Sequence, residues 1–377
     1  MLQAQVSHFD DARVLSLLSS HTYDEVHAMT GWSRGRIYAL ALRSGARKTE
    51  QRIRERQAER RQRQEETLRN LINNTAKADV LDFLDGLPDN SVAMHICSPP
   101  YGLGKPYGDC PSADTMRFTF LHGWLMMCIS EIARTLKPGG VVCFQVGKTR
   151  DWQNQLIPMD WVLAEDFRRA GLTFQSRVIW TQKHGLTPKS RLADRHETIM
   201  VFSKGEQATF NPNTARTPQQ QPDKRAFKGP RRGELSGHPY GAFPTDVWDD
   251  IPQVGHNHPD TKLGKHPAQF PVRLAKRAIL LYTLAQDLVC DCFCGSGSSA
   301  IAAIETGRNF VGADLFYEDL RAKRVAAAGM DRVTPLPGIS DEAVAVWQAE
   351  ARRVDKTAAA LSPADDVLLC RQYKLIA

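Results

Sequence analysis

The spacing of apolar positions changes along the chain and divides it into regions. Before residue 46, apolar residues recur at helical spacing and predict three short helices, at 11–18, 23–29 and 34–43. From about residue 76, short apolar strands alternate with amphipathic helices. Strands are predicted at 92–97, 141–146, 173–180, 198–202, 288–293 and 309–313, and helices at 121–136, 161–170 and 298–305. This alternation predicts an α/β fold with a doubly wound, mostly parallel sheet.

Two stretches lack this periodicity. Between Arg43 and Arg69 there are ten Arg or Lys against five Glu, which predicts an exposed basic linker helix over 46–75. That helix is either a solvated connection or a face that lies along phosphates, and the sequence leaves both open. Between Glu206 and Lys262 the pattern gives way to Gly, Pro, Gln, His and Arg, and so long an irregular stretch is expected to be functional.

Composition narrows the class of protein. A chain of 377 residues has room for two or three domains. The longest apolar candidate, Ala278–Cys290, is interrupted by Asp287, and the N-terminus lacks the layout of a secretory signal, so we expect no membrane span. The eight cysteines show no CxxC spacing, which argues against a disulfide scaffold or structural zinc and favours a reducing cytoplasm. Lys and Arg exceed Asp and Glu by 49 − 42 = 7, which favours a polyanionic partner.

The N-terminal region, 1–45, has the layout of a helix-turn-helix. Gly31 falls at the turn, and Ser33 is available to cap the third helix. Apolar residues fall where such a unit packs its helices: Val26, Ile37 and Leu40. Arg34 and Arg36 would then face DNA from the start of the recognition helix, whereas His27 departs from the pattern because a small residue usually occupies that place. Structural three-helix bundles share this layout, so DNA binding is one of two interpretations.

A glycine-rich turn links a predicted strand to a predicted helix. It reads Asp291-Cys-Phe293-Cys-Gly295-Ser296-Gly297, and its glycines allow a tight turn and close approach of a ligand to the helix N-terminus. It is not a full GxGxxG, because Ala300 occupies the third glycine position. Asp314 follows 23 residues after Asp291, at the end of the next strand, where an acidic residue binds ribose hydroxyls in nucleotide-binding folds.

A second motif, Ser98-Pro99-Pro100-Tyr101, directly follows the predicted strand 92–97. The prolines stiffen the chain and remove two backbone donors, which leaves hydrogen-bond acceptors and an aromatic ring. Such a group suits a flat heterocycle with an exocyclic amine, which would stack on Tyr101. The alternative is a proline-stiffened loop with a surface tyrosine, and the position at the carboxyl end of a strand argues against it.

Together these two motifs resemble those of the beta-class DNA amino-methyltransferases, in which the catalytic motif precedes the cofactor motif. The resemblance extends over roughly 76–324 and includes five further segments: Leu87-Pro-Asp-Asn-Ser91, Arg134-Thr-Leu-Lys-Pro-Gly-Gly140, Arg195-His-Glu197, Asp246-Val-Trp248 and Lys265-His-Pro-Ala-Gln-Phe-Pro271. It implies a catalytic half at 76–205, a target-recognition region at 206–262, a cofactor-binding half at 263–330 and a C-terminal extension at 331–377.

The resemblance also implies the role of each site residue. Ser98 to Tyr101 would hold the flipped base, and S-adenosylmethionine would be the methyl donor. The implied cofactor-binding residues are Asp79, His266, Pro267, Ala268, Asp291, Phe293, Gly295, Ser296, Gly297 and Asp314. Ala268 departs from relatives that carry Thr there. The implied DNA contacts in the recognition region are Lys224, Arg225, Lys228, Arg231 and Arg232. We expect no metal site, because His256, His258 and His266 have no cysteine partners.

The resemblance leaves the target base open. Ser at position 98 is commonest among cytosine-N4 enzymes, whereas the layout of the whole chain resembles bacterial orphan adenine methyltransferases, and we favour adenine N6. Double-stranded DNA is the expected partner, with a homodimer as in many relatives and a nucleoid-associated, cytoplasmic location. An RNA base methyltransferase and a DNA-binding regulator on the same fold are the competing hypotheses.

Overall fold

The computed structural model divides into two compact units, Met1–Arg69 and Asn70–Ala377. The described residues are 10–19, 21–45, 47–108, 114–116, 118–151, 153–185, 187–238, 240–255 and 257–328. The C-terminal extension expected at 331–377 therefore lies outside the described residues.

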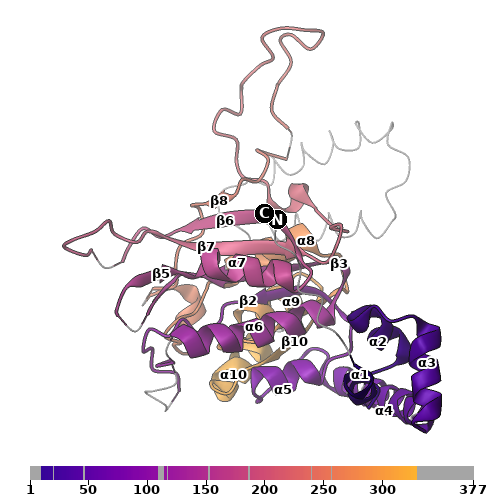
Figure 1. Cartoon of the computed structure of the whole chain (residues 1–377). Helices are drawn as coiled ribbons and strands as arrows, with labels where there is room; N and C mark the ends of the chain where they lie inside the picture. The colour runs from indigo at the N-terminus through magenta and orange to yellow at the C-terminus, as the bar shows by residue number, and fades with distance from the viewer. Residues whose placement is uncertain are drawn as a thin grey trace. The chain divides into compact units, whose positions relative to one another are not determined.

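The first unit contains three short helices, α1 (Asp11–Leu17), α2 (Tyr23–Thr30) and α3 (Arg34–Arg43) (Figure 1). The residue before each helix caps its N-terminus, because its side-chain oxygen accepts a hydrogen bond from a backbone N–H of the first turn: Asp10, Thr22 and Ser33. Gly31 ends α2 with a φ of 70°, a left-handed conformation that glycine adopts without strain. The three apolar residues expected to pack at the centre, Val26, Ile37 and Leu40, are buried.

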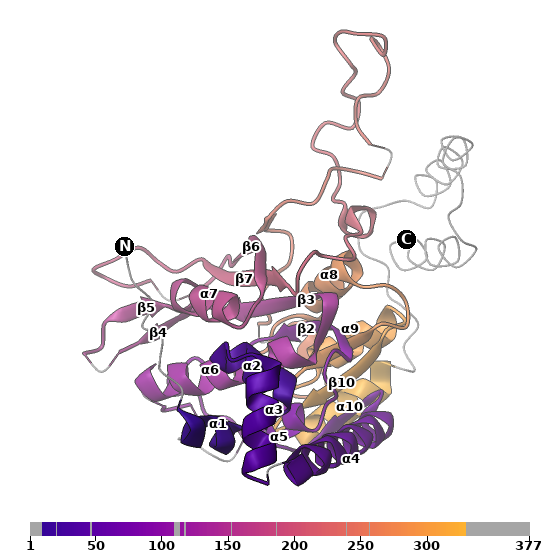
Figure 2. The same ribbon diagram turned by 45° about the vertical axis from the view of Figure 1, so that its right-hand side comes forward.

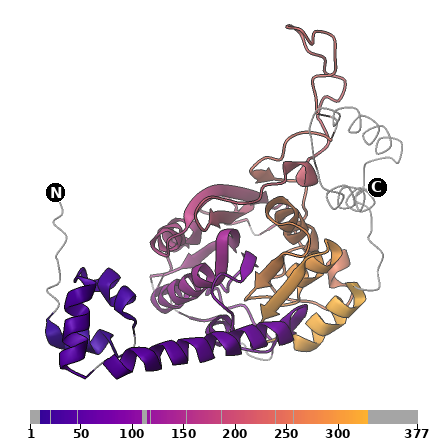
Figure 3. The ribbon, with the colours of Figure 1, turned by 90° about the vertical axis from the view of Figure 1, so that its right-hand side faces the viewer.

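A single helix, α4 (Arg47–Leu71), follows this bundle (Figure 3). Most of its described side chains are exposed, and Arg61 pairs with Glu65 one turn later at 3.1 Å. The basic run is thus helical, as its composition predicts, but it ends four residues before the expected boundary at 75. Its function as a linker or as a phosphate-binding face stays a prediction.

An eight-stranded sheet forms the centre of the second unit, with the order β1-β10-β9-β2-β3-β7-β6-β8 (Figure 1). Its strands are β1 (Asn74–Ala76), β2 (Val92–Cys97), β3 (Leu136–Val146), β6 (Thr173–Thr181), β7 (His196–Ser203), β8 (Val247–Trp248), β9 (Leu288–Asp291) and β10 (Asn309–Ala313). The first five strands in this order are parallel, whereas β7 runs antiparallel to both β3 and β6. The predicted doubly wound, mostly parallel sheet is confirmed.

Helices pack on both faces of this sheet (Figures 1 and 3). Those on one face are α5 (Val80–Asp85), α6 (Phe118–Thr135) and α7 (Met159–Arg169), and those on the other are α8 (Val272–Tyr282), α9 (Ser298–Glu305) and α10 (Glu318–Ala328). The ring of Phe167 on α7 lies 5.1 Å from Phe144 and 4.8 Å from Phe202 of the sheet. Apolar side chains of β2, β3, β6 and β7 form the core against α8 and α9.

The sequence-based prediction was wrong at one junction. Lys137-Pro-Gly-Gly140 was expected to separate a helix from a strand beginning at Val141, but β3 already begins at Leu136. Leu136 pairs with Val92 of β2, and the register then shifts before Val141 pairs with Met94. The ammonium of Lys204 on the neighbouring segment donates to the carbonyl of Leu136 at 2.9 Å, so tertiary contacts hold the proline-containing segment extended.

Residues 206–262 have little regular structure. They contain two 3-10 turns, η1 (Pro212–Ala215) and η2 (Pro259–Thr261), and the edge strand β8. Residues 216–238 and 240–243, here called the projecting loop, extend away from the sheet (Figures 1 and 2). Antiparallel bridges join Thr217 to Ala242 near its base and Arg225 to Leu235 near its tip. Apart from the sheet, β4 (Lys148–Arg150) and β5 (Leu156–Pro158) form a small hairpin.

None of the helices within the described ranges combines the length and apolar character needed to cross a membrane.

Candidate active site

A cavity opens at the carboxyl ends of the parallel strands. Its volume is about 660 Å³, within the range of ligand-binding pockets. In the sheet β9 and β2 are neighbours, and the chain proceeds from them in opposite directions, to β10 on one side and to β3 on the other. Ligands of open α/β sheets bind at such a switch point, because the two connections leave on opposite faces and open a crevice.

Both sequence motifs line this one cavity. Ser98, Pro99, Pro100 and Tyr101 follow β2, and Phe293, Gly295 and Ser296 follow β9. The motifs are nearly 200 residues apart in the chain, and the parallel pairing of β2 with β9 brings them together. Asp79, Asp314 and the segment His266–Ala268 line the same space, whereas Gly297 and Asp291 do not.

Backbone geometry explains the glycines of the turn after β9. Gly295 has a φ of +45°, and a Cβ atom there would lie 2.8 Å from Nε2 of His266. Gly297 has a φ of 83° and directly precedes α9. The turn therefore brings backbone and imidazole close together at the cavity wall, which a larger residue at 295 would prevent.

Two carboxylates face the cavity from the ends of secondary structure. Asp314, after β10, accepts hydrogen bonds from the backbone N–H groups of Gly295 and Phe316, each at 2.9 Å. Burial raises the pKa of Asp314 above its usual value. Asp79 caps α5 by accepting from the N–H of Leu81 at 2.9 Å. Each carboxylate keeps lone pairs for hydroxyl or amine donors of a ligand.

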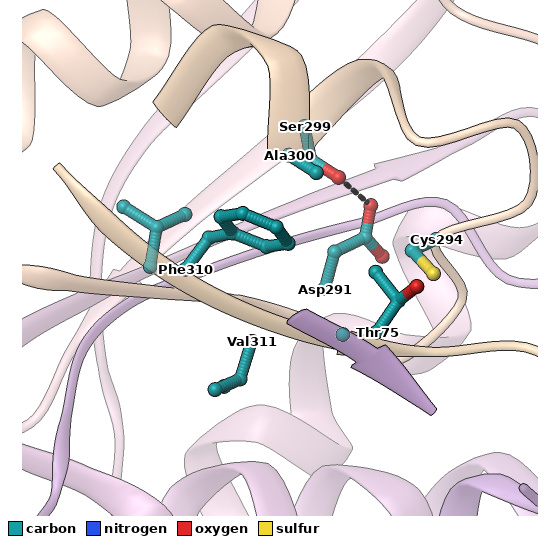
Figure 4. Close-up of a pocket in the computed structure, with 9 residues that line it drawn as sticks. Thr75, Asp291, Cys294, Ser299, Ala300, Phe310 and Val311 are labelled. Atoms are coloured by element: carbon teal, nitrogen blue, oxygen red, sulfur yellow. Dashed lines mark hydrogen bonds between the residues drawn. The ribbon is translucent and has the colours of Figure 1, made fainter. Parts of the chain in front are cut away.

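Asp291 has a different environment from the one its motif suggests. Its side chain lies behind the turn, 3% exposed, beside the small pocket of Figure 4, where one oxygen accepts from Ser299 Oγ at 2.5 Å. The other oxygen accepts from the N–H of Phe293 at 3.0 Å. Burial raises the pKa of Asp291 to about 7. The structure therefore places Asp291 as a support of the turn and not in contact with the cavity.

His266 lies between two tyrosine rings at the cavity wall. The centroids of Tyr107 and Tyr317 are 5.7 and 4.4 Å from its ring, and its Nδ1 accepts from the N–H of Ala268 at 3.2 Å. Burial lowers the pKa of His266 to about 4, so the imidazole is neutral at physiological pH. Tyr317 has a φ of 59°, which is rare for an aromatic residue and marks a strained segment beside the site.

Two residues of the Ser98–Tyr101 motif are linked by hydrogen bonds to two polar side chains from neighbouring strands. Ser98 Oγ is 3.3 Å from the Tyr101 hydroxyl, which donates to Glu197 Oε2 at 3.3 Å. Gln145 Nε2 donates to the same carboxylate oxygen at 2.5 Å. Burial and the Glu197 charge raise the pKa of Tyr101 well above its ordinary range, so the phenol keeps its proton.

Sequence reasoning missed several residues of the site. Arg321 on α10 donates to the carbonyl of Gly295 at 2.9 Å, and Arg324, one turn later, donates to the carbonyl of Ser296 at 2.7 Å. Trp124 of α6 packs edge-on against Phe293, with centroids 5.6 Å apart. Gln145 was detectable as the one polar residue in the apolar run 141–146, whereas nothing in the sequence marks the two arginines as buried.

The five basic residues predicted in the recognition region gather in the projecting loop. Lys224, Arg225, Lys228, Arg231 and Arg232 are all exposed. Arg231 pairs with Glu234 at 2.9 Å, and Arg225 donates to the carbonyl of Gly233 at 2.7 Å. Phe227 lies among them with 89% of its surface exposed.

The two arginines predicted in the N-terminal unit are exposed but engaged within that unit. Arg34 pairs with Asp24 at 2.7 Å, and the guanidinium of Arg36 lies 3.4 Å from the centroid of Trp32. His27, which departs from the helix-turn-helix pattern, is exposed and its Nδ1 lies 2.6 Å from the Trp32 carbonyl, so it does not crowd α3. Exposed pairs of this kind contribute little and can be exchanged for phosphates.

Across the described ranges, no group of three or more His, Cys, Asp and Glu side chains could hold a metal ion. His256 lies outside those ranges. The Sγ atoms of Cys97 and Cys292 lie 3.8 Å apart, both residues are buried, and Cys292 is part of the cavity lining.

Comparison with known proteins matches this architecture. The DNA methylase family, which covers N6 and N4 methyltransferases, matches residues 92–322. Over 248 residues the chain is 34% identical to the type II methyltransferase M.BglII of Bacillus subtilis, with 66% of each chain covered. It is 27% identical over 245 residues to the DNA adenine methyltransferase YhdJ of Escherichia coli (strain K12), with 64% of this chain and 78% of that protein covered. Among solved structures, the cytosine-N4-specific PvuII DNA methyltransferase has a TM-score of 0.50 at 21% identity, with 73% of this chain and 91% of that chain covered, a likeness of fold.

The fold and the cavity define a Rossmann-like methyltransferase domain. The chain belongs to the DNA methylase family of N6 and N4 amino-methyltransferases. Membership confirms the cofactor expected from the resemblance, S-adenosylmethionine. The matched part spans about two thirds of M.BglII's own length. The beta-class order and the target base stay predictions.

Proposed function

We propose that the protein transfers a methyl group from S-adenosylmethionine to the exocyclic amine of a base flipped out of double-stranded DNA. One observation carries this proposal: the acceptor-rich Ser98–Tyr101 segment and the glycine turn after β9 line the same cavity. A methyl transfer of this kind needs both reactants in one water-poor space, because near-attack geometry supplies much of the rate.

The cavity has groups that suit each part of the cofactor. Asp314 offers carboxylate oxygens for ribose hydroxyls and Asp79 for an adenine amine, while Phe293 offers an aromatic wall. The neutral His266 and the backbone of Ala268 lie at the same wall for the methionine end. When bound, S-adenosylmethionine supplies an electrophilic methyl group on a sulfonium.

The base would occupy the side of the cavity formed by the Ser98–Tyr101 segment. Taking it out of the stack costs a few kcal/mol, and stacking on the Tyr101 ring returns about 1–3 kcal/mol. The Ser98 hydroxyl and the Pro99 carbonyl accept hydrogens of the amine, which directs its lone pair toward the methyl group. Ser98 is a neutral acceptor and positions the amine without acting as a general base.

Adenine N6 is the acceptor that we propose, on the basis of the whole-chain layout with its N-terminal helical unit, and YhdJ is a relative that carries the adenine-specific name. Cytosine N4 is the second candidate, and the serine at position 98 favours it, because Ser is the form commonest in that group.

The projecting loop supports double-stranded DNA as the partner. Its exposed cations would bind phosphates or guanine edges, and an exposed aromatic such as Phe227 among cations suits a nucleic acid surface. A DNA substrate would place the enzyme at the nucleoid, and a role in regulation as an orphan enzyme belongs to the same proposal, as does pairing into a homodimer.

A nucleoside digest tests the proposal. The protein is incubated with labelled S-adenosylmethionine and genomic DNA, and the methylated nucleoside is identified by mass spectrometry, with a Tyr101→Ala variant as control. N6-methyladenine is expected, and N4-methylcytosine would select the second candidate. Label absent from DNA and present in RNA supplied in parallel would overturn the DNA assignment.

A further inference from the structure

Ser98 and Gln145 lie side by side at the carboxyl ends of two neighbouring central strands, β2 and β3. Cys97 of β2 pairs with Phe144 of β3, and the two strands are parallel, so the next residues along each strand are neighbours. Both side chains line the cavity, as do Tyr101 and Glu197. Three strands, β2, β3 and β7, thus bring four polar side chains to one point.

The carboxylate of Glu197 determines which way the protons of this group point. An ionised carboxylate only accepts hydrogen bonds, so both the Tyr101 hydroxyl and the Gln145 amide must donate to it. The Tyr101 hydroxyl has one proton and uses it on Glu197. The 3.3 Å contact between Ser98 and Tyr101 must then be made by the proton of Ser98. The lone pairs of Ser98 Oγ consequently stay available as acceptors.

The same constraint determines the orientation of the Gln145 amide. Because Nε2 donates to Glu197, Oε1 is the end that remains, and this oxygen is buried without a hydrogen-bond partner among the described residues. Gln145 as a whole is 6% exposed. A buried acceptor without a partner is unfavourable, and in a ligand site it is explained when the ligand supplies the donor.

We propose that Gln145 is a further base-binding residue, whose Oε1 shares one hydrogen of the target amine with Ser98 Oγ while the Pro99 carbonyl accepts the other. Glu197 is then the positioning residue that orients Gln145 and Ser98 as acceptors. This inference rests on the proposed function. Adenine and cytosine both carry their Watson–Crick donor hydrogens on the exocyclic amine alone, so an additional acceptor at this point recognises that amine. As the C–N bond formed and the S–C bond of the sulfonium broke, a neutral thioether would leave and the nitrogen would become positively charged, so its hydrogens would be stronger donors to Gln145 and Ser98. One of these hydrogens would then be released to solvent as a proton.

The test replaces the acceptor and measures binding and chemistry separately. Gln145→Leu roughly keeps the volume and removes the whole amide, both Oε1 and the Nε2 that donates to Glu197. We expect the single-turnover rate of DNA methylation to fall about tenfold to a hundredfold, with the dissociation constant of S-adenosylmethionine unchanged within about twofold. Gln175→Leu is the matched control: Gln175 lies at the exposed end of β6, donates to Ser203 at 2.7 Å, and should leave the rate close to wild type.

A double-mutant cycle tests the positioning role of Glu197. Glu197→Gln and Tyr101→Phe each break the same chain of hydrogen bonds that orients Ser98 and Gln145. We therefore expect the rate loss of the double variant to be smaller than the product of the two single losses. Independent, multiplicative losses would overturn the positioning role.

The base-binding role of Gln145 is overturned if Gln145→Leu methylates at the wild-type rate, or if its rate, cofactor affinity and melting temperature fall together. These outcomes differ from failure of the proposed function, in which the wild-type protein itself leaves DNA unmethylated.

Discussion

The cavity at the strand ends and the projecting loop use polar side chains in opposite ways. In the cavity, Glu197 accepts hydrogen bonds from Tyr101 and Gln145, and Asp314 accepts from the N–H of Gly295, so these polar groups have partners within the fold. In the loop, Lys228 and Arg232 are exposed, and the segment has two antiparallel bridges in place of a sheet. Internal hydrogen bonds preorganise a reaction site, whereas exposed, solvated cations are available to bind the phosphates of a nucleic acid. Under the proposed function, the cavity would carry out the methyl transfer and the projecting loop would contact the DNA, and each role can be tested without the other.

The largest expected effect is on the cavity side of this comparison. Tyr101→Ala removes the ring on which the base would stack, and a loss of about 1–3 kcal/mol lowers the methylation rate about 5- to 150-fold. Cofactor affinity should change little, and isothermal titration with S-adenosylmethionine measures it. Trp161→Ala, at a side chain that is 74% exposed on α7, serves as the aromatic control. Equal losses of rate and cofactor affinity would argue against the stacking role.

Removal of charge from the projecting loop should weaken DNA binding and leave cofactor affinity unchanged. Lys228→Ala combined with Arg232→Ala should weaken DNA binding and reduce the slope of log affinity against log salt by about 2, because each phosphate contact contributes about 0.9. Fluorescence anisotropy from about 50 to 200 mM salt measures the slope. A variant that lost cofactor affinity as well would show that the loop and the cavity are not separate in function.

For the N-terminal unit we expect a smaller change in the salt dependence of DNA affinity. Deletion of residues 1–45 should lower the salt slope by about 1–2 if Arg34 and Arg36 contact phosphates. The same anisotropy series checks it. An unchanged slope would make the three-helix unit structural, which is the second interpretation that its sequence leaves open.

The smallest effect concerns Asp291, which supports the cavity from behind. The pKa of Asp291 is about 7 in the folded protein, against 3.8 for an ordinary aspartate, so the folded state holds this proton after the unfolded state has released it. The contribution of Asp291 to the free energy of unfolding therefore falls as pH rises from about 4 to 7. Asp291→Asn should gain stability relative to wild type over that range, by about 2–4 °C in melting temperature for each kcal/mol. A constant difference between the two proteins from pH 4 to 8 would contradict the raised pKa.

Prediction from the sequence succeeded where the signal is local. Helix α9 and strand β10 have the predicted bounds, because apolar periodicity and a glycine turn delimit them. Helices α5, α8 and α10 were not predicted. The apolar residues of α8 pack on the sheet and on α9. The buried residues of α10 are two arginines, and a hydropathy pattern does not detect a buried helix face that consists of arginine.

By itself, the sequence determined the class of fold, the two motifs and the family that they resemble, because strand spacing, prolines and glycines act on their immediate neighbours. Tertiary structure decided that Ser98 and Gly295 share one cavity, that Asp291 lies behind it, and that Gln145 and Glu197 meet Tyr101. These arrangements depend on which strands pair and in which register, and pairing is a property of distant segments. Residues from β2, β3, β7 and β9 become neighbours only once the sheet has formed.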